Sequence, residues 1–222
     1  MRKIAVVFLG KPGAGKGTQA DLLADDFIGV HFNTGEIIRR RIANPQTDED
    51  RREKAIYDSG RLNTLDWVTG MVVEKAHAYW RSGQSVVLSG SPRSLYEAER
   101  LIPELIQDYG KDNVYAVLLD IDDNDAVLRN TSRLTCTGCG FTPNITAERQ
   151  NDAGQCPQCG AVLIRRTIDT KEKILGERLP AYNKTTAPAV DYIRGLGILH
   201  EIDGRLSKEE VFAKIMAIIR KE

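Results

Sequence analysis

The sequence predicts an α/β fold built on a five-stranded parallel sheet. Short runs rich in Val, Ile and Leu alternate with longer segments of helical periodicity, and a glycine-rich turn follows the first run. This alternation is typical of a parallel sheet whose two faces are both covered by helices. The predicted strands are residues 4–9, 30–32, 85–89, 114–119 and 197–202.

Helices are predicted where apolar residues recur at spacings of three and four, as in residues 65–80 and 211–219. Ser207 and Glu210 form a capping-box pattern before the last helix, and Asp169 with Glu172 gives a similar start signal. Residues 33–63 and 132–168 interrupt the rhythm and are interpreted as insertions at the edge of the sheet. Within the first insertion, the charged run 48–54 taken alone favours a solvated helix face.

The composition is that of a soluble globular protein. The chain has 222 residues, of which 41% are apolar, and its 31 basic and 31 acidic residues give no net charge. We therefore expect neither an extended nucleic-acid surface nor a membrane-binding surface, and no apolar run is long enough to span a bilayer. The basic start and the apolar run 4–9 lack a small-residue cleavage pattern, so a buried strand accounts for them better than a signal peptide. We expect a cytoplasmic protein.

A phosphate-binding loop is predicted directly after the first strand. Residues 10–18 read Gly-Lys-Pro-Gly-Ala-Gly-Lys-Gly-Thr and lead into a helical pattern. Glycines allow successive backbone N–H groups to surround an anion, the helix N-terminus adds positive potential, and Lys16 supplies an ammonium group. A purely structural glycine turn is the alternative, which the strand and helix on either side disfavour. The loop residues expected to contact ATP are Gly13, Ala14, Gly15, Lys16, Gly17 and Thr18.

Four cysteines predict a structural metal site. They stand as Cys136-x2-Cys139 and Cys156-x2-Cys159, the spacing of a closed tetrahedral zinc site. We expect zinc in preference to an iron centre or disulfides, and four thiolates leave no open position for metal catalysis. A nucleic-acid-binding zinc ribbon is the competing interpretation, but the surrounding residues carry little basic charge.

The loop also indicates a family. Gly17 stands where the general phosphate-loop pattern has Ser or Thr, and the hydroxyl comes one place later, at Thr18. This form resembles the loop of the adenylate kinase family, and the resemblance, to its long zinc-containing type, extends over nearly the whole chain. It implies a three-layer phosphate-loop fold with a core at 1–32, 64–131 and 169–222, a helical monophosphate-binding insertion at 33–63 and a small zinc-bound lid at 132–168.

The resemblance implies an activity as well. It is the reversible Mg²⁺-dependent transfer of a phosphoryl group from ATP to AMP, which gives two ADP, in a monomeric enzyme with small-molecule partners only. The implied residues for the nucleoside monophosphate are Thr34, Gly35, Arg39, Leu62, Asn63, Gly90, Arg93 and Glu97. Those added for ATP are Arg129, Arg133, Arg166 and Leu206, and the implied catalytic set is Lys16, Arg93, Arg133 and Arg178.

This set suits phosphoryl transfer, which needs alignment and charge neutralisation more than covalent help from the protein. Arginines remain charged and grip phosphate through two parallel hydrogen bonds. A helix through Arg129 and Arg133 would place both on one face, because they are four residues apart. No histidine is required as a base, so His31, His77 and His200 are interpreted as structural.

Four departures from the family pattern bear on function. Ser89 replaces an Asp that orients water around Mg²⁺, and Ser91 replaces a Phe near the acceptor nucleotide. Thr167 stands where an Arg is expected, and Arg166 is carried over after a slip of one residue. Glu97 replaces a Gln that reads adenine.

These departures leave two alternatives open. An ionised Glu97 matches the two N–H donors of guanine, so a kinase for another monophosphate, GMP first, is one alternative. Thr34 argues for adenine, because pyrimidine-preferring relatives tend to carry Ala there. The loss of Asp at position 89 motivates the other alternative, an ATP-binding protein without efficient transfer.

Overall fold

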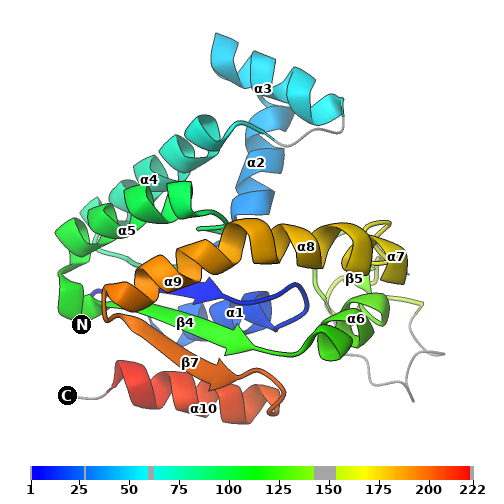
Figure 1. Cartoon of the computed structure of the whole chain (residues 1–222). Helices are drawn as coiled ribbons and strands as arrows, with labels where there is room; N and C mark the ends of the chain where they lie inside the picture. Colours follow the sequence, from blue (N-terminus) through cyan, green and yellow to red (C-terminus); the bar gives the residue numbers. More distant parts are fainter. Residues whose placement is uncertain (1, 28, 60–62, 143–153, 221–222) are drawn as a thin grey trace.

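A parallel sheet in the strand order β2-β3-β1-β4-β7 lies at the centre of the computed structural model, which describes residues 2–27, 29–59, 63–142 and 154–220 (Figure 1). All neighbouring strands of this sheet run parallel. Each predicted strand is confirmed, with small shifts at the ends. The strands are β1 (Ala5–Leu9), β2 (Gly29–Phe32), β3 (Ser85–Leu88), β4 (Val114–Asp120) and β7 (Leu199–Asp203).

Helices occupy most of the remaining described residues. They are α1 (Lys16–Asp26), α2 (Thr34–Ala43), α3 (Asp48–Asp58), α4 (Leu65–Arg81), α5 (Leu95–Tyr109), η1 (Lys111–Asn113), α6 (Asp123–Thr131) and α10 (Lys208–Ile219). A continuous helical run contains α7 (Lys171–Lys173), η3 (Ile174–Arg178), α8 (Leu179–Ala181), η4 (Tyr182–Thr186) and α9 (Ala187–Gly195). In this run η3 and η4 are wider π-helical turns. Within the described residues, no helix has the length and apolar character needed to cross a membrane.

Two hydrophobic cores lie on opposite faces of the sheet. Val86 packs on one face with α4, α5 and α9, whereas its neighbour Val87 packs on the other face with α1 and α10. This follows from the alternation of side chains along a strand. Figure 1 shows α5 and α9 on one side of β4 and β7, with α10 on the other. The arrangement confirms the predicted α/β fold with helices on both faces.

The parallel strands place all their carboxyl ends at one edge of the sheet. The loop after β1, the segment between β3 and α5, the start of α6 and the loop after β7 therefore lie together at that edge. Open parallel sheets of this kind bind ligands there. The residues predicted from these four segments are thus brought into one region.

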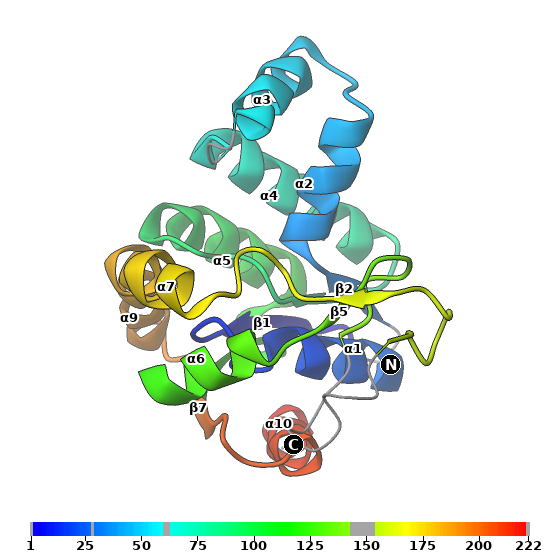
Figure 2. The same ribbon diagram turned by 90° about the vertical axis from the view of Figure 1, so that its right-hand side faces the viewer.

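The helices α2 and α3 project away from the sheet (Figures 1 and 2). The interpretation of residues 48–54 as a solvated face is wrong for two of them, because Asp50 and Glu53 are only 1% and 4% exposed. Asp50 accepts a hydrogen bond from Trp67 Nε1 at 3.0 Å, and Glu53 accepts one from the Thr64 N–H at 3.0 Å. Burial raises the pKa of Asp50, but hydrogen bonds from Arg41 and other donors lower it well below its usual value. Both carboxylates tie α3 to the start of α4.

The two predicted helix starts have different outcomes. The capping box of Ser207 and Glu210 is confirmed at α10. The Asp169 signal is wrong, because Thr170 caps α7 and accepts from the N–H of Lys173 at 3.3 Å. Asp169 is buried and serves a different purpose, described below.

Candidate active site

The phosphate-binding loop has the geometry that its sequence predicts. Gly10, Gly13 and Gly15 adopt positive φ values of 135°, 86° and 94°, which glycine adopts without strain. Helix α1 begins at Lys16, and its cap, Gly15, provides no side-chain acceptor for the first-turn N–H groups. The Lys16 ammonium donates to the carbonyl oxygens of Gly10 at 2.6 Å and Lys11 at 2.8 Å, so it lies over the loop. A helix start and an ammonium group on the same loop form an anion-binding arrangement.

Three arginines from distant parts of the chain surround Lys16. Arg93 follows β3, Arg133 follows α6, and Arg178 ends η3. Burial, and then the positive charges of Arg93, Arg178 and Arg133, lower the pKa of Lys16 to about 7. Because like charges repel, such a gathering is stable only where other groups compensate it, and it suits a ligand with several negative charges.

Asp169 holds two of these arginines in place. Its carboxylate accepts from Nε of Arg133 at 2.9 Å and Nη2 at 2.8 Å, and from Nη1 of Arg178 at 2.6 Å. The side chain of Asp169 is 1% exposed. A carboxylate that accepts from both arginines fixes the distance between the two guanidinium groups.

Asn130 provides the second support for the same arginines. Its Oδ1 accepts from Nη2 of Arg133 at 2.9 Å and from Nη1 of Arg178 at 3.1 Å, and the residue is fully buried. The phosphate-binding loop packs directly on this amide, because a Cβ at Gly13 would lie 2.5 Å from Asn130 Nδ2. The loop and the arginine pair are therefore positioned by one side chain.

The sequence reasoning missed both supports. Asp169 had a signal, but its spacing to Glu172 was interpreted as a helix cap. The signal for Asn130 is weaker, since it is only its position between Arg129 and Arg133, two arginines that the resemblance implies for ATP. The expectation that Arg129 and Arg133 share one helix face is wrong, since α6 ends at Thr131 and Arg133 lies beyond it.

Arg166 lies near two arginines of the cluster around Lys16, namely Arg133 and Arg178. Its Nε donates to Thr135 Oγ1 at 3.0 Å. Burial, the positive charge of Arg133 and, more weakly, that of Arg39 lower the pKa of Arg166. Arg39 lies on α2, so this region reaches from the first insertion to the second.

A polar network forms where the resemblance implies a bound monophosphate. Thr34 Oγ1 donates to Ser91 Oγ at 3.0 Å, and Arg93 Nε donates to the carbonyl of Gly90 at 2.7 Å. Gly90 approaches α2 closely, since a Cβ there would lie 3.1 Å from that of Thr34. Gly35 is the second residue of α2.

Glu97 is part of this network and is 5% exposed. Its Oε2 accepts from the backbone N–H of Arg93 at 3.1 Å, which ties the carboxylate to the segment between β3 and α5. Burial raises the pKa of Glu97. Asn63 uses its side chain elsewhere and donates to the carboxylate of Glu53 at 2.9 Å, while Leu62 lies outside the described residues.

Two further residues expected to contact ATP, Arg129 and Leu206, lie at the far end of the loop region. Arg129 Nη1 donates to the carbonyl of Gly204 at 2.7 Å and so links α6 to the loop after β7, and Leu206 packs against the core beneath. Lys11 points elsewhere and pairs with Asp123 at 2.7 Å. It borders a pocket of about 520 Å³ whose lining includes four carboxylates, of Asp120, Asp122, Glu201 and Asp203. That negative lining does not suit a triphosphate.

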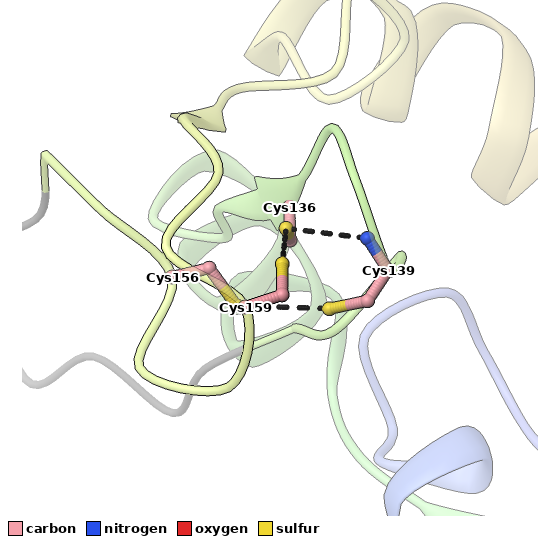
Figure 3. A group of neighbouring side chains, drawn as sticks. All are labelled: Cys136, Cys139, Cys156 and Cys159. Carbon is pink, nitrogen blue, oxygen red and sulfur yellow. Dashed lines mark hydrogen bonds between the residues drawn. The ribbon is translucent and has the colours of Figure 1, made fainter.

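The four cysteines converge as predicted (Figure 3). Their ligand atoms lie within 4.8 Å of one another, with Sγ of Cys136 3.4 Å from that of Cys159 and Sγ of Cys139 3.7 Å from that of Cys156. Hydrogen bonds from the N–H groups of Cys139 and Gly138 help to lower the pKa of Cys136 to about 6. Four soft donors at these separations, one already favoured as a thiolate, fit a tetrahedral metal ion.

A small antiparallel sheet carries the cysteine cluster. It consists of β5 (Thr135–Cys136) and β6 (Leu163–Ile164), and Figure 2 shows it beside the carboxyl edge of the main sheet. Among the described residues of this insertion few apolar side chains pack there, namely Leu163 with partial cover from Leu134, Phe141 and Ala161. A metal ion bound by the four cysteines would cross-link so small a core and stabilise its shape.

The parallel sheet, the glycine loop and the four gathered cations define a phosphate-loop protein of the nucleotide-binding α/β class. A family model described as adenylate kinase matches residues 8–198. An adenylate kinase from Lachnospira eligens is 34% identical over 96% of this chain and 99% of its own length. An adenylate kinase from Archaeoglobus fulgidus is 32% identical over 97% of this chain and 98% of its own. The chain belongs to the adenylate kinase family.

Proposed function

We propose that this protein catalyses the reversible Mg²⁺-dependent transfer of the terminal phosphoryl group of ATP to AMP. The observation that carries the proposal is the convergence of Lys16, Arg93, Arg133 and Arg178 at the phosphate-binding loop. When two nucleotides bind with their phosphates facing each other, negative charge is concentrated where the phosphates meet. The four basic side chains can neutralise that charge. The activity in the names of the family relatives agrees with this chemistry.

Each cation has a distinct part in the proposed reaction. Lys16 and the first turn of α1 bind the β- and γ-phosphates of ATP, and Arg93 holds the phosphate of AMP. Arg133 and Arg178, spaced by Asp169, stabilise the charge on the phosphoryl group as it moves. When bound to ATP, Mg²⁺ would neutralise further phosphate charge. The proposed reaction needs no general base, since the phosphate oxygen of AMP is already an anionic nucleophile at neutral pH.

The remaining site residues complete two nucleotide subsites. We assign Gly13, Ala14, Gly15, Gly17, Thr18, Arg129, Arg166 and Leu206 to ATP. We assign Thr34, Gly35, Arg39, Leu62, Asn63, Gly90 and Glu97 to the acceptor. The side chain of Asn63 is bonded to Glu53, so its contact with a nucleotide would be made by its backbone.

We further propose that residues 132–168 form a lid held by zinc and that residues 33–63 form the monophosphate-binding insertion. Arg133 lies near the start of the lid and Arg166 near its end, so closure would bring both onto the phosphates and exclude water. Zinc is tested by native mass spectrometry of the untreated protein. A mass about 60 Da above the chain, after correction for lost thiol protons, supports zinc, and an unmodified mass argues against a resident metal.

We also expect a cytoplasmic monomer that binds no nucleic acid. The absence of net charge on the chain supports the last of these three expectations, that nucleic acid is not bound. Sedimentation velocity at micromolar concentration, with and without nucleotides, tests the oligomeric state. A single-chain mass in both conditions is the expected result.

One observation favours a second acceptor, GMP. Glu97 is a carboxylate where an amide would suit adenine better, and an ionised carboxylate matches the N–H donors of guanine. An acceptor panel with Mg²⁺-ATP and AMP, GMP, CMP, UMP or no acceptor decides between the two. Preference for AMP supports the proposal. Preference for GMP would identify GMP as the acceptor in place of AMP. ATP binding without transfer to any acceptor would identify a protein that only binds ATP.

A further inference from the structure

Ser89, His31 and Asp21 form a hydrogen-bonded chain at the edge of the phosphate site. His31 Nδ1 lies 2.5 Å from Asp21 Oδ1, and His31 Nε2 lies 2.6 Å from Ser89 Oγ. Asp21 lies on α1, His31 lies on β2, and Ser89 directly follows β3. The imidazole is 15% exposed, so two bonds from the protein fix its plane and little water reaches it.

The sheet register directs this chain toward the phosphate-binding loop. His31 pairs with Val87, and Val87 packs on the α1 face of the sheet. Ser89 follows Val87 by two residues and therefore has its side chain on that same face. Val7 of β1 pairs with Leu88, the last residue of β3, so Ser89 leaves the sheet beside the end of β1, which leads into Gly10. The hydroxyl thus lies where β1 enters the loop.

The donors and acceptors along the chain have one consistent order. An ionised Asp21 can only accept, so Nδ1 of His31 carries the proton. In the neutral ring Nε2 is then an acceptor, and the Ser89 hydroxyl donates its hydrogen to it. Within the described residues no other hydrogen bond reaches Ser89 Oγ, so both of its lone pairs can accept. The imidazole connects this hydroxyl to the carboxylate of Asp21, whose side chain is 70% exposed.

Mg²⁺ bound to nucleotide phosphates keeps several of its waters, and those waters donate hydrogen bonds to nearby acceptors. We propose that Asp21 and His31 convert Ser89 into an acceptor-only oxygen that orients the hydration waters of nucleotide-bound Mg²⁺. The inference rests on the proposed function, and it assigns a positioning role to His31, which sequence reasoning treated as structural. Ser89 would thereby take the part of the carboxylate that this chain lacks.

The first test needs neither nucleotide nor metal. Long-range ¹H–¹⁵N correlation spectra of the imidazoles identify which nitrogen of His31 carries the proton, with His31→Gln giving the assignment. The Nδ1–H form is expected, with a shift toward the Nε2–H form in Asp21→Ala. A wild-type ring protonated on Nε2 would overturn the inference, because Ser89 would then receive a hydrogen bond instead of donating one.

The second test is a double-mutant cycle on the Mg²⁺ requirement. Ser89→Ala and His31→Gln should each raise the free Mg²⁺ needed for half-maximal transfer about fivefold, the effect of one hydrogen bond. The double variant should equal Ser89→Ala alone. Ser89→Asp should need less Mg²⁺ than wild type and turn over faster, and His31→Gln should add no further requirement in that background. Additive effects of the two single variants would contradict the proposed chain.

His77→Gln is the matched control, because His77 also contacts a carboxylate, Asp108, at 2.5 Å and lies away from the phosphate site between α4 and α5. It should leave the Mg²⁺ requirement unchanged.

Calorimetry of ATP binding with and without Mg²⁺ tests the inference separately from the proposed function. Suppose that no acceptor is phosphorylated, but that Mg²⁺ strengthens ATP binding less in His31→Gln than in the wild-type protein. The inference then stands and the proposed function fails. A phosphoryl group found covalently on Ser89 by intact mass would make it a nucleophile and overturn the inference.

Discussion

Asp169 accepts hydrogen bonds from both Nε and Nη2 of Arg133, and a further bond from Arg178 reaches the same carboxylate. The two arginines are 45 residues apart in sequence, yet one buried acid and one buried amide, Asn130, set their separation. Preorganised cations of this kind cost little reorganisation when charge develops in a transition state.

Asp169→Asn should therefore lower kcat about ten- to a hundredfold, the range expected when charge-assisted hydrogen bonds are lost. The fold should persist, because Asn can still accept from one arginine. Steady-state kinetics and thermal unfolding measure the two effects. Asp191→Asn is the control, since Asp191 pairs with Arg194 at the surface of α9. An equal loss of activity in both variants would show that Asp169 has no special part.

Lys16 should take up a proton when ATP binds. Its pKa of about 7 in the free protein makes it largely neutral at pH 8, and the negative phosphates should raise that pKa again. The terminal phosphate is already ionised at pH 8, so uptake close to one proton is expected. Calorimetry in buffers of different ionisation enthalpy measures it. Lys16→Arg should show none, because a guanidinium is charged throughout; equal uptake in both proteins would locate the proton elsewhere.

The acceptor preference should depend on pH through Glu97. Its raised pKa means that more of it is protonated in mild acid than for an ordinary carboxyl, and a protonated carboxyl can donate and accept as adenine requires. The ratio of kcat/KM for AMP to that for GMP should fall as pH rises from 5 to 8. In Glu97→Gln the ratio should be higher, by about tenfold at pH 8, and independent of pH. The same dependence of this ratio on pH in both proteins would show that Glu97 has no role in base selection.

Metal removal should loosen the lid and spare the core. The cysteine-bearing sheet has little apolar packing of its own, whereas the central sheet has helices on both faces. Chelation should thus lower kcat and expose residues 132–168 to protease at a temperature where the far-ultraviolet circular dichroism changes little. Cys156→Ser should behave like the chelated protein. Cooperative unfolding of the whole chain on chelation would contradict a separate, metal-held lid.

The features that sequence predicts well here are those written in local patterns. The apolar runs predict each strand of the central sheet, the glycine spacing predicts the loop before α1, and the paired cysteines predict the cluster of four thiols. Features that depend on long-range pairing were harder to predict. Asp50 and Glu53 have the local pattern of surface charges because the donors Trp67 and Thr64 lie on α4 and directly before it, outside the charged run.

Asp169 was misread for a related reason. Its spacing to Glu172 matches a capping box, but two arginines already occupy its carboxylate and Thr170 caps the helix instead. His31 gave no local signal, because its partners are ten residues before it and fifty-eight residues after it. Local spacing cannot report such pairings, which the sheet register creates.

The central claim is that the four cations at the loop serve phosphoryl transfer between two nucleotides. The most direct measurement is ³¹P NMR of the protein with Mg²⁺ and ADP alone. The account predicts that ATP and AMP appear in equal amounts and reach an equilibrium, with no inorganic phosphate, and that Arg178→Ala slows this by orders of magnitude. Release of inorganic phosphate in place of AMP and ATP, or an unchanged ADP spectrum, would contradict it.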